Sequence, residues 1–202
     1  MAVSSESKEH KALRYEQICG VFENEKEITL HDVGMGISDL YGYILDNFKE
    51  HNVTYSGSDI LKEYVIESKQ RYSNLNFYHR NIISDKCDDK YDYVVMSGVF
   101  HQRQDTTIKD WEEYLQEIVS KAFFMSEKAI AFNVISPFVD FYQTNVYYCN
   151  LPKLLNFIND KLSRFFAIKH NYALYEFTVY VYKENYIISR YPQKQFRKYF
   201  KI

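Results

Sequence analysis

The chain has 202 residues, of which 46% are hydrophobic and 26% charged, a composition that fits one folded domain and is too apolar for a disordered chain. Proteins that bind nucleic acid through phosphate contacts over their whole surface are normally basic, so the net charge of −2 disfavours that class. Three cysteines without a C-x-x-C pair argue against a disulfide scaffold and predict a cytosolic protein. No run of about 18 uncharged apolar residues occurs, so we expect no membrane span.

The apolar pattern predicts helices and strands that alternate along most of the chain. The predicted helices span 8–22, 38–49, 61–72, 109–126 and 151–162. The predicted strands span 28–33, 53–58, 75–79, 91–97, 128–135, 165–170 and 174–183. This alternation predicts an α/β three-layer sandwich with a mostly parallel sheet. The last two strands should be antiparallel, because a three-residue link cannot cross a sheet.

The strongest functional signal is the sequence Asp32-Val-Gly34-Met35-Gly36, which joins a predicted strand to a predicted helix. The two glycines let the backbone turn tightly and approach a ligand with no Cβ in the way. The free N–H groups of the following helix, with Ser38 as its expected N-cap, would face the same ligand. Asp32 could accept hydrogen bonds from a cationic or hydroxylated group.

Three further polar segments follow the next three predicted strands. Asp59 comes 23 residues after Gly36, where an acid in a nucleotide-binding sheet takes the two hydroxyls of a ribose. Asn81 follows the third strand, where a polar side chain could read the edge of an adenine, and the segment 97–101 (SGVFH) follows the fourth. All of these segments would meet at the carboxyl ends of strands, where open α/β sheets bind ligands.

Together these segments resemble class I S-adenosylmethionine-dependent methyltransferases. The segment 32–36 is similar to the family's glycine-rich motif, 57–60 to its ribose-binding acid and 92–98 to its fourth-strand motif, and the terminal hairpin resembles its antiparallel seventh strand. The resemblance covers roughly residues 13–183 and implies a seven-stranded sheet and S-adenosylmethionine as cofactor. The cofactor-binding residues that it implies are Arg14, Tyr15, Asp32, Gly34, Met35, Gly36, Asp59, Ile60, Asn81, Ile82, Ser97, Gly98 and Val99.

A narrower resemblance concerns the segments 12–15, 97–100 and 175–180. They are similar to small methyltransferases from bacterial surface-polysaccharide clusters, which implies a sugar or phosphoramidate derivative as acceptor. We expect one methyltransferase domain over 1–185, with an N-terminal helix that covers the cofactor, and a basic extension over 186–202. The close alternative is a NAD-binding Rossmann domain, but its third glycine is replaced here by Asp39, and about 200 residues leave little room for a second catalytic region.

Methyl transfer from a sulfonium is an in-line displacement, so the protein mainly binds, aligns and excludes water. His101, directly after the fourth predicted strand, is the predicted general base for a hydroxyl acceptor, although a loop histidine or a substrate-binding histidine also fits this position. A phosphate or carboxylate acceptor would need no base. Arg103 could hold an anionic acceptor or be a surface charge.

The other predicted substrate contacts are aromatic. Phe100 precedes His101, and Tyr142 and Tyr147 belong to the aromatic loop 136–148, whose rings could line the acceptor pocket or shield the sulfonium. The same loop could instead pack on the core or form a homodimer contact.

We therefore expect an O-methyltransferase that acts on a small molecule or sugar derivative, without a metal ion, because the six histidines lack ligand spacing. One alternative is a non-catalytic partner subunit with the same fold. Another is a nucleic-acid methyltransferase guided by the basic tail after residue 186; the absence of an Asn/Asp-Pro-Pro-Tyr motif speaks against its base-amine version. The tail could also be a solvated extension.

Overall fold

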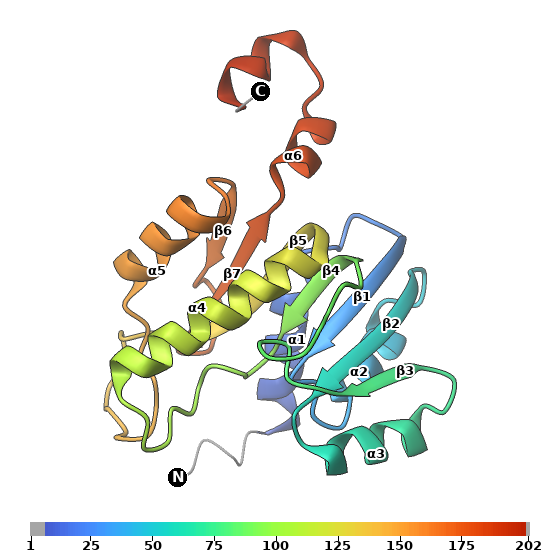
Figure 1. The fold of residues 1–202 in the computed structure, drawn as a ribbon, viewed down its shortest axis with the longest axis vertical. Helices are drawn as coiled ribbons and strands as arrows, with labels where there is room; N and C mark the ends of the chain where they lie inside the picture. The colour runs from blue at the N-terminus through green and yellow to red at the C-terminus, as the bar shows by residue number, and fades with distance from the viewer. Residues whose placement is uncertain (1–6, 201–202) are drawn as a thin grey trace.

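The computed structural model describes residues 7–200 (Figure 1). The α-helices are α1 (Lys8–Cys19), α2 (Asp39–Asn47), α3 (Lys62–Arg71), α4 (Ile108–Met125), α5 (Leu151–Phe157) and α6 (Glu184–Arg190). The strands are β1 (Glu27–Val33), β2 (Asn52–Asp59), β3 (Asn76–His79), β4 (Tyr91–Met96), β5 (Ser126–Ile135), β6 (Phe166–Lys169) and β7 (Glu176–Tyr182). A π-helical turn follows α5 over Ile158–Leu162, and a 3-10 segment spans Lys194–Tyr199.

The strands form one seven-stranded sheet in the order β3-β2-β1-β4-β5-β7-β6. The pairs among β1 to β5 are parallel, whereas β7 runs antiparallel to both β5 and β6. The predicted fold class is therefore confirmed. Because β7 runs against β5, its first residue, Glu176, lies opposite Ile135 at the end of β5. The start of β7 thus joins the carboxyl ends of the parallel strands.

Two apolar layers cover the two faces of this sheet. Helices α1, α2 and α3 pack on one face around Leu30 and Tyr93, and α4 and α5 pack on the other around Val94 and Phe132. Neighbouring residues of β4, Tyr93 and Val94, thus serve opposite layers, as the pleat of a strand requires. Burial of each such side chain contributes about 1.5–3 kcal/mol, so the sheet is a firm base for the loops at its edge.

Several predicted boundaries differ from the structure for local reasons. Helix α1 ends at Cys19, because Val21 and Phe22 turn back to form tighter i to i+3 hydrogen bonds. Helix α4 begins at Ile108, because Thr107 accepts the N–H of Asp110 as its N-cap. The helix predicted over 151–162 widens into the π-helical turn, and β6 and β7 are separated by six residues instead of three.

Ser38 does precede α2, but its side chain does not cap the helix as predicted. Its backbone is left-handed, with a φ of 62°, and its buried hydroxyl donates to Oγ of Ser68 at 2.9 Å. Ser68 in turn donates to the carbonyl of Gly36. The hydroxyl therefore ties α2 to α3 beneath the loop that follows β1.

The C-terminal extension rises beyond the end of β7 and is fixed to the domain at its start (Figure 1). The Tyr186 hydroxyl donates to Oε1 of Glu25 at 2.6 Å, and the Tyr93 hydroxyl donates to the same oxygen at 2.8 Å. Lys128 forms an ion pair with Glu25 as well. The boundary predicted after residue 185 falls within α6, and Lys201 of the basic tail lies outside the described residues.

Replacing Tyr186 by phenylalanine should lower the free energy of unfolding by about 1.5–3 kcal/mol, because a hydrogen bond to a partly buried carboxylate is lost. Urea denaturation measures the change. Tyr191→Phe is the matched control, since the Tyr191 side chain is 48% exposed and should tolerate the loss of its hydroxyl. Equal stability of the two variants would show that α6 is not anchored through Tyr186.

Candidate cofactor and active site

The turn after β1 is built from two glycines in left-handed conformation. The φ angles of Gly34 and Gly36 are 70° and 56°, values that residues with a Cβ rarely adopt. The N–H groups of Gly34 and Met35 both donate to the carbonyl of Ser58 on β2, at 2.8 and 3.2 Å. This glycine loop is therefore held against the carboxyl end of the neighbouring strand.

Met35 points from the glycine loop into the protein. Its side chain is buried and fills the space above Gly57 of β2, where a Cβ would lie 3.1 Å from the Cβ of Met35. Only the backbone of Met35 therefore belongs to the exposed surface of the loop.

Asp59 ends β2 beside the glycine loop, as the strand order requires. Its Oδ2 accepts the N–H of Gly36 at 3.0 Å, and its Oδ1 accepts the N–H of Leu61 at 2.9 Å. Each carboxylate oxygen has two lone pairs, so both oxygens keep capacity for a hydroxyl donor. The glycine loop and Asp59, which the sequence predicts to meet at this sheet edge, are thus in direct contact.

Asp32 at the end of β1 is buried and only partly satisfied. The Tyr55 hydroxyl donates to its Oδ2 at 2.8 Å, whereas its Oδ1 has no hydrogen-bond partner among the described residues. Burial, with a further contribution from the negative charge of Asp59, raises the pKa of Asp32 to about 7 against the opposing effect of the Tyr55 hydrogen bond. A buried acceptor without a donor costs about 1–3 kcal/mol, which a cationic or donor ligand would recover.

Gly98, after β4, is the third left-handed glycine at this edge, with a φ of 76°. A Cβ placed on Gly36 or on Gly98 would meet no heavy atom of the described residues within 4 Å. Both glycines therefore border open space, whereas a Cβ on Gly34 would strike Val99. Asp59 stands next to Gly36, whose N–H it accepts.

A buried polar network lies under the same edge. The guanidinium of Arg14 on α1 grips Glu176 on β7, with Nε at 3.1 and 2.9 Å from the two carboxylate oxygens. Asn133 on β5 donates to Glu176 and contacts Nε2 of His101 at 2.8 Å. Burial alone would raise the pKa of Glu176, but the hydrogen bonds of Arg14 and Asn133 and the charges of His101 and Arg14 bring that pKa below its usual value. Glu176 is therefore a buried carboxylate.

No family model matches the chain. Among curated proteins, "Putative methyltransferase Rv1506c" of Mycobacterium tuberculosis is 26% identical over 160 residues, which cover 77% of this chain and 93% of that protein.

Solved structures share the architecture at lower identity. Magnesium protoporphyrin IX methyltransferase (ChlM) from Synechocystis PCC 6803 with bound SAM matches with a TM-score of 0.61 at 13% identity, over 86% of this chain and 79% of that chain. The N-methyltransferase NodS from Bradyrhizobium japonicum WM9 in complex with S-adenosyl-L-homocysteine matches with a TM-score of 0.62 at 9% identity, over 84% of this chain and 85% of that chain. This chain has the class I methyltransferase fold.

Four side chains of this methyltransferase fold were predicted to contact substrate; two of them are packed in the core and a third supports its own loop. The Phe100 ring is enclosed in the core, edge-on to Phe132, and Tyr147 is buried with its hydroxyl 3.4 Å from Glu112. The Arg103 guanidinium donates to the carbonyls of Thr106 and Thr144 and so braces its own loop. Contacts of these three side chains with a substrate therefore require the protein to rearrange.

The aromatic loop does offer exposed rings at the end of β5. Phe138, Phe141 and Tyr142 are 68%, 65% and 67% exposed. The Tyr142 hydroxyl donates to the carbonyl of Pro137 at 2.8 Å, so the loop has an internal support. Of the four predicted substrate contacts, Tyr142 is the one whose ring lies open.

The predicted cofactor-binding residues that follow β2 and β3 lie in different environments. Asn81 is exposed, and its Oδ1 accepts the N–H of Ile83 at 2.9 Å in a local turn. Ile82 is buried in the core, whereas Ile60, next to Asp59, is 59% exposed. Their roles toward a cofactor stay predictions.

The remaining predicted cofactor-binding residues lie on α1, the helix predicted to cover the cofactor, and at the end of β4. Tyr15 on α1 is half-buried and packs against the ring of Tyr43 at 5.8 Å. Ser97 and Val99 are partly buried on either side of Gly98. The guanidinium of Arg14, another predicted cofactor-binding residue, forms an ion pair with Glu176 in the structure.

Asn133 and Glu176 are the residues that sequence reasoning missed. Each is a strongly polar residue in a mostly apolar segment, AFNVI for Asn133 and YEFTV for Glu176. Buried polar groups are normally hydrogen-bonded, so such isolated residues signal a buried network. The sequence does not show, however, that the two lie 43 positions apart yet side by side.

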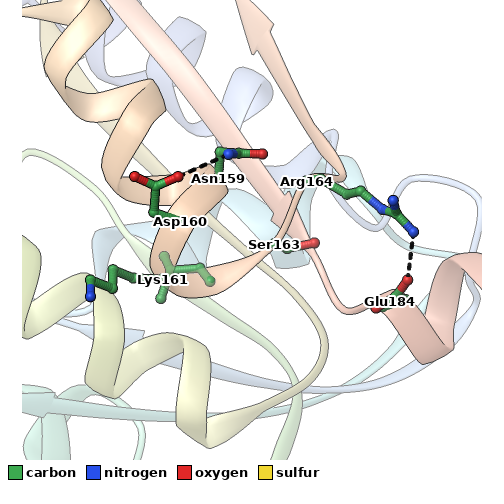
Figure 2. A pocket seen from close by; sticks show the side chains of 7 residues that line it. Asn159, Asp160, Lys161, Ser163, Arg164 and Glu184 are labelled. Carbon is green, nitrogen blue, oxygen red and sulfur yellow. Dashed lines mark hydrogen bonds and ion pairs between the residues drawn. The ribbon is translucent and has the colours of Figure 1, made fainter. Parts of the chain in front are cut away.

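Other features of the described residues lie outside this site. None of the helices between residues 7 and 200 is long and apolar enough to cross a bilayer. In the same range no three metal-ligating side chains gather. Figure 2 shows a hollow between the π-helical turn that follows α5 and the start of α6, where Arg164 and Glu184 form an ion pair at 3.1 Å. Its lining contains no side chain of the candidate site.

Proposed function

We propose that this protein is an S-adenosylmethionine-dependent methyltransferase. The observation that carries the proposal is the carboxylate of Asp59 on the N–H of Gly36, a glycine that borders open space, together with the buried Asp32, whose Oδ1 is unpartnered among the described residues. This donor and acceptor set fits the cofactor, which combines hydroxyls with positive charge. The fold, shared with proteins solved with bound SAM or S-adenosyl-L-homocysteine, supports the same conclusion.

Each group of the site would then have a defined task. Asp59 would accept hydrogen bonds from the ribose hydroxyls, and the glycine loop would approach the cofactor through its backbone. The unpartnered oxygen of Asp32 would face the positively charged end. The cofactor supplies an electrophilic methyl group on a sulfonium, so the protein has to bind, orient and exclude water.

The methyl acceptor that we propose is an oxygen of a small molecule or sugar derivative. The segments that resemble polysaccharide-cluster methyltransferases support this choice, and the exposed rings of Phe138, Phe141 and Tyr142 offer flat apolar surfaces to a ring-shaped acceptor. Titration calorimetry with S-adenosylmethionine and turnover with a panel of acceptors test the proposal. Failure to bind the cofactor at millimolar concentration would refute it, and binding without any turnover would favour a non-catalytic subunit.

Gly36→Ala should weaken cofactor binding more than tenfold, because the added methyl group projects into the open space. The left-handed backbone also makes the variant less stable by about 1–2 kcal/mol. Calorimetry measures the affinity. Gly42→Ala adds the same group within α2, outside the glycine loop, and should bind the cofactor as the wild type does. If Gly36→Ala also binds normally, the cofactor does not approach this loop.

Cofactor binding should release protons near neutral pH. Because the pKa of Asp32 is about 7, its carboxyl is half protonated at pH 7, and a nearby positive charge would lower that pKa. The released fraction should grow as the pH falls from about 8 to about 6. Calorimetry in buffers of different ionisation enthalpy counts these protons, and Asp32→Asn should abolish the buffer dependence. A buffer-independent enthalpy in the wild type would place the charge elsewhere.

The same raised pKa has a consequence for the cofactor-free protein. In the unfolded chain the pKa of Asp32 has its ordinary value of 3.8. The folded state therefore binds the Asp32 proton more tightly than the unfolded chain does. The contribution of Asp32 to stability therefore declines as the pH rises from about 4 to about 7.

A further inference from the structure

The basic extension over 186–202 differs in charge from the rest of the chain. It holds five of the chain's 25 lysines and arginines and none of its 27 acids, so it carries a net charge of +5 and residues 1–185 carry −7. Four of its basic residues are described by the structure, and none of them forms an ion pair with a described acid; they are Arg190, Lys194, Arg197 and Lys198. Their charge is available to a partner.

The extension also leaves aromatic rings exposed. Tyr191 and Tyr199 are 48% and 56% exposed, and neither α6 nor the 3-10 segment contains a buried residue. Tyr191 lies edge-on to Phe196 at 5.9 Å, and Phe200 contacts Phe165, just before β6, at 5.6 Å. In Figure 1 the extension stands away from the sheet and its helices. It therefore adds little to the core.

The order of basic and aromatic residues in the extension follows the period of an α-helix. At about 100° per residue, the basic residues fall within one stripe about 100° wide; they are Arg190, Lys194, Arg197, Lys198 and Lys201. The rings of Phe196, Tyr199 and Phe200 fall on the opposite half. Pro192 suits the first turn of such a helix, where its missing N–H is not needed.

The structure does not contain this α-helix. Lys194–Tyr199 form a 3-10 helix, whose tighter turn separates Lys198 from Lys194 and Arg197. A run of six residues is long for a 3-10 helix, which has the poorer hydrogen-bond geometry. An α-helix of about eleven residues is marginal in water by itself. A surface that binds the apolar half would supply the missing stability.

A second group of cations lies at the same edge of the sheet. The Lys183 ammonium, just before α6, lies 3.8 Å from the centre of the Phe123 ring. The Lys90 ammonium, just before β4, lies 3.5 Å from the centre of the Phe124 ring, which is 54% exposed. Burial and the charge of Lys90 lower the pKa of Lys183 against the opposing charge of Glu127, so the two lysines repel each other. Negative charge brought to this edge would relieve the repulsion.

We propose that the basic extension docks this protein on a membrane that contains anionic lipids, with the segment from Pro192 onward as an amphipathic α-helix in the membrane surface. Its lysines and arginines would meet the lipid phosphates, and the rings of Phe196, Tyr199 and Phe200 would enter the boundary between headgroups and acyl chains. Residues 1–185, with their net charge of −7, would be repelled by such a surface, and the extension stands clear of them (Figure 1).

The distribution of residues favours a lipid bilayer over two other partners. Binding of a nucleic-acid strand combines cations for the phosphates with rings for the bases on one face, whereas the helical pattern places them on opposite halves. A second copy of this chain would have to offer an apolar seat for the rings. The hollow beside α6 offers none, because polar and charged side chains supply most of its lining (Figure 2).

Docking through the extension leaves the candidate cofactor site turned away from the membrane. Strand β7 runs from Glu176, at the edge that carries the site, to Tyr182, before the extension, and its seven residues span about 23 Å. The glycine loop at the far edge would stay open to water. The inference therefore concerns where the protein acts and does not rest on the proposed function.

Cosedimentation of the full chain with phospholipid vesicles tests the docking. At about 0.15 M salt, where distant charges are screened, we expect binding to vesicles of phosphatidylcholine mixed with phosphatidylglycerol and none to phosphatidylcholine alone. Arg197→Gln/Lys198→Gln changes two exposed side chains and should lower the partition coefficient at least about tenfold. Equal binding to both kinds of vesicle, or to neither, would overturn the proposal.

Lys49→Gln/Lys69→Gln is the matched control for that variant. It removes the same charge from two exposed residues of the domain, one after α2 and one on α3. Its partition coefficient should equal that of the wild type. A loss as large as that of the extension variant would show that net charge alone governs binding, and would refute a docking surface on the extension.

Tyr199→Trp reports whether the apolar half enters the lipid. Trp111 on α4 is the chain's one native tryptophan, so the wild type provides the baseline. With saturating mixed vesicles, emission of the new indole should shift to shorter wavelength and be quenched by brominated acyl chains. The indole of Lys194→Trp, on the cationic stripe, should escape that quenching. Equal quenching at the two positions, or none at 199, would contradict the amphipathic α-helix.

The two other partners give different results with the same preparations. A dimer in sedimentation velocity that Arg197→Gln/Lys198→Gln abolishes, without vesicle binding, would assign the extension to a second copy. Binding of single-stranded RNA without vesicle binding would assign it to nucleic acid, and either result overturns the proposal. Calorimetry with S-adenosylmethionine tests the proposed function separately: absent binding refutes the methyltransferase activity and leaves the docking surface intact.

Discussion

Arg14→Met should lower the free energy of unfolding by about 3–5 kcal/mol, because it leaves the carboxylate of Glu176 buried without its charge partner. The side chains of Arg14 and Glu176 are 7% and 4% exposed, so solvent cannot replace the lost guanidinium. The pair also connects α1 with β7, 162 positions away, so the loss should loosen the helix from the sheet. Urea denaturation at pH 7 measures the effect.

A neighbouring ion pair supplies the control for this experiment. Lys11 on the same helix pairs with Asp39, but the two side chains are 48% and 31% exposed. Lys11→Met should therefore cost less than about 1 kcal/mol. The double variant Arg14→Met/Glu176→Gln should recover part of the loss, because it removes the stranded charge. If Arg14→Met and Lys11→Met are equally stable, the buried pair contributes nothing beyond an exposed one.

Asp59→Ala should weaken cofactor binding about 100-fold, which corresponds to about 3 kcal/mol. Two hydroxyl donors would lose a charged acceptor, and hydrogen bonds to charged groups contribute about 1.5–3 kcal/mol each. The N–H groups of Gly36 and Leu61 lose their acceptor as well, so the glycine loop becomes less well held. Calorimetry with S-adenosylmethionine measures the affinity, and thermal unfolding shows whether the fold persists.

Asp39→Ala is the matched control for Asp59. Asp39 is also an acidic residue that follows a strand and its loop, as the first residue of α2. Its carboxylate forms ion pairs with Lys11 and Arg71 instead of accepting an N–H of the glycine loop. Its replacement should change stability slightly and affinity not at all. Unchanged affinity in a folded Asp59→Ala variant would mean that the ribose lies elsewhere.

The fold and the location of the site follow from the sequence for a topological reason. Alternating helices and strands lead to a parallel sheet, and a parallel sheet brings the segments after its strands to one edge. The contact between Asp59 and Gly36 is a direct result, since β1 and β2 are neighbours in register. The left-handed angles of Gly34 and Gly36 agree with the sequence argument that these glycines let the backbone turn tightly.

The side-chain environment could not be predicted in the same way. The sequence pattern of a helix is the same whether its arginine faces a ligand or the carboxylate of a distant strand. In the structure Arg14 faces Glu176. The direction of a loop side chain is equally hidden, which is why Phe100 was expected to contact substrate although its ring is enclosed in the core. Such contacts depend on which residues tertiary packing brings together.

The packing of Met35 over Gly57 constrains how this sheet edge can change. The two residues share one volume, so a larger side chain at 57 requires a smaller one at 35. Met35 thereby works as a spacer between the glycine loop and the backbone of β2. Variation at these two positions should be concerted, and redesign of this sheet edge should treat them as a single unit.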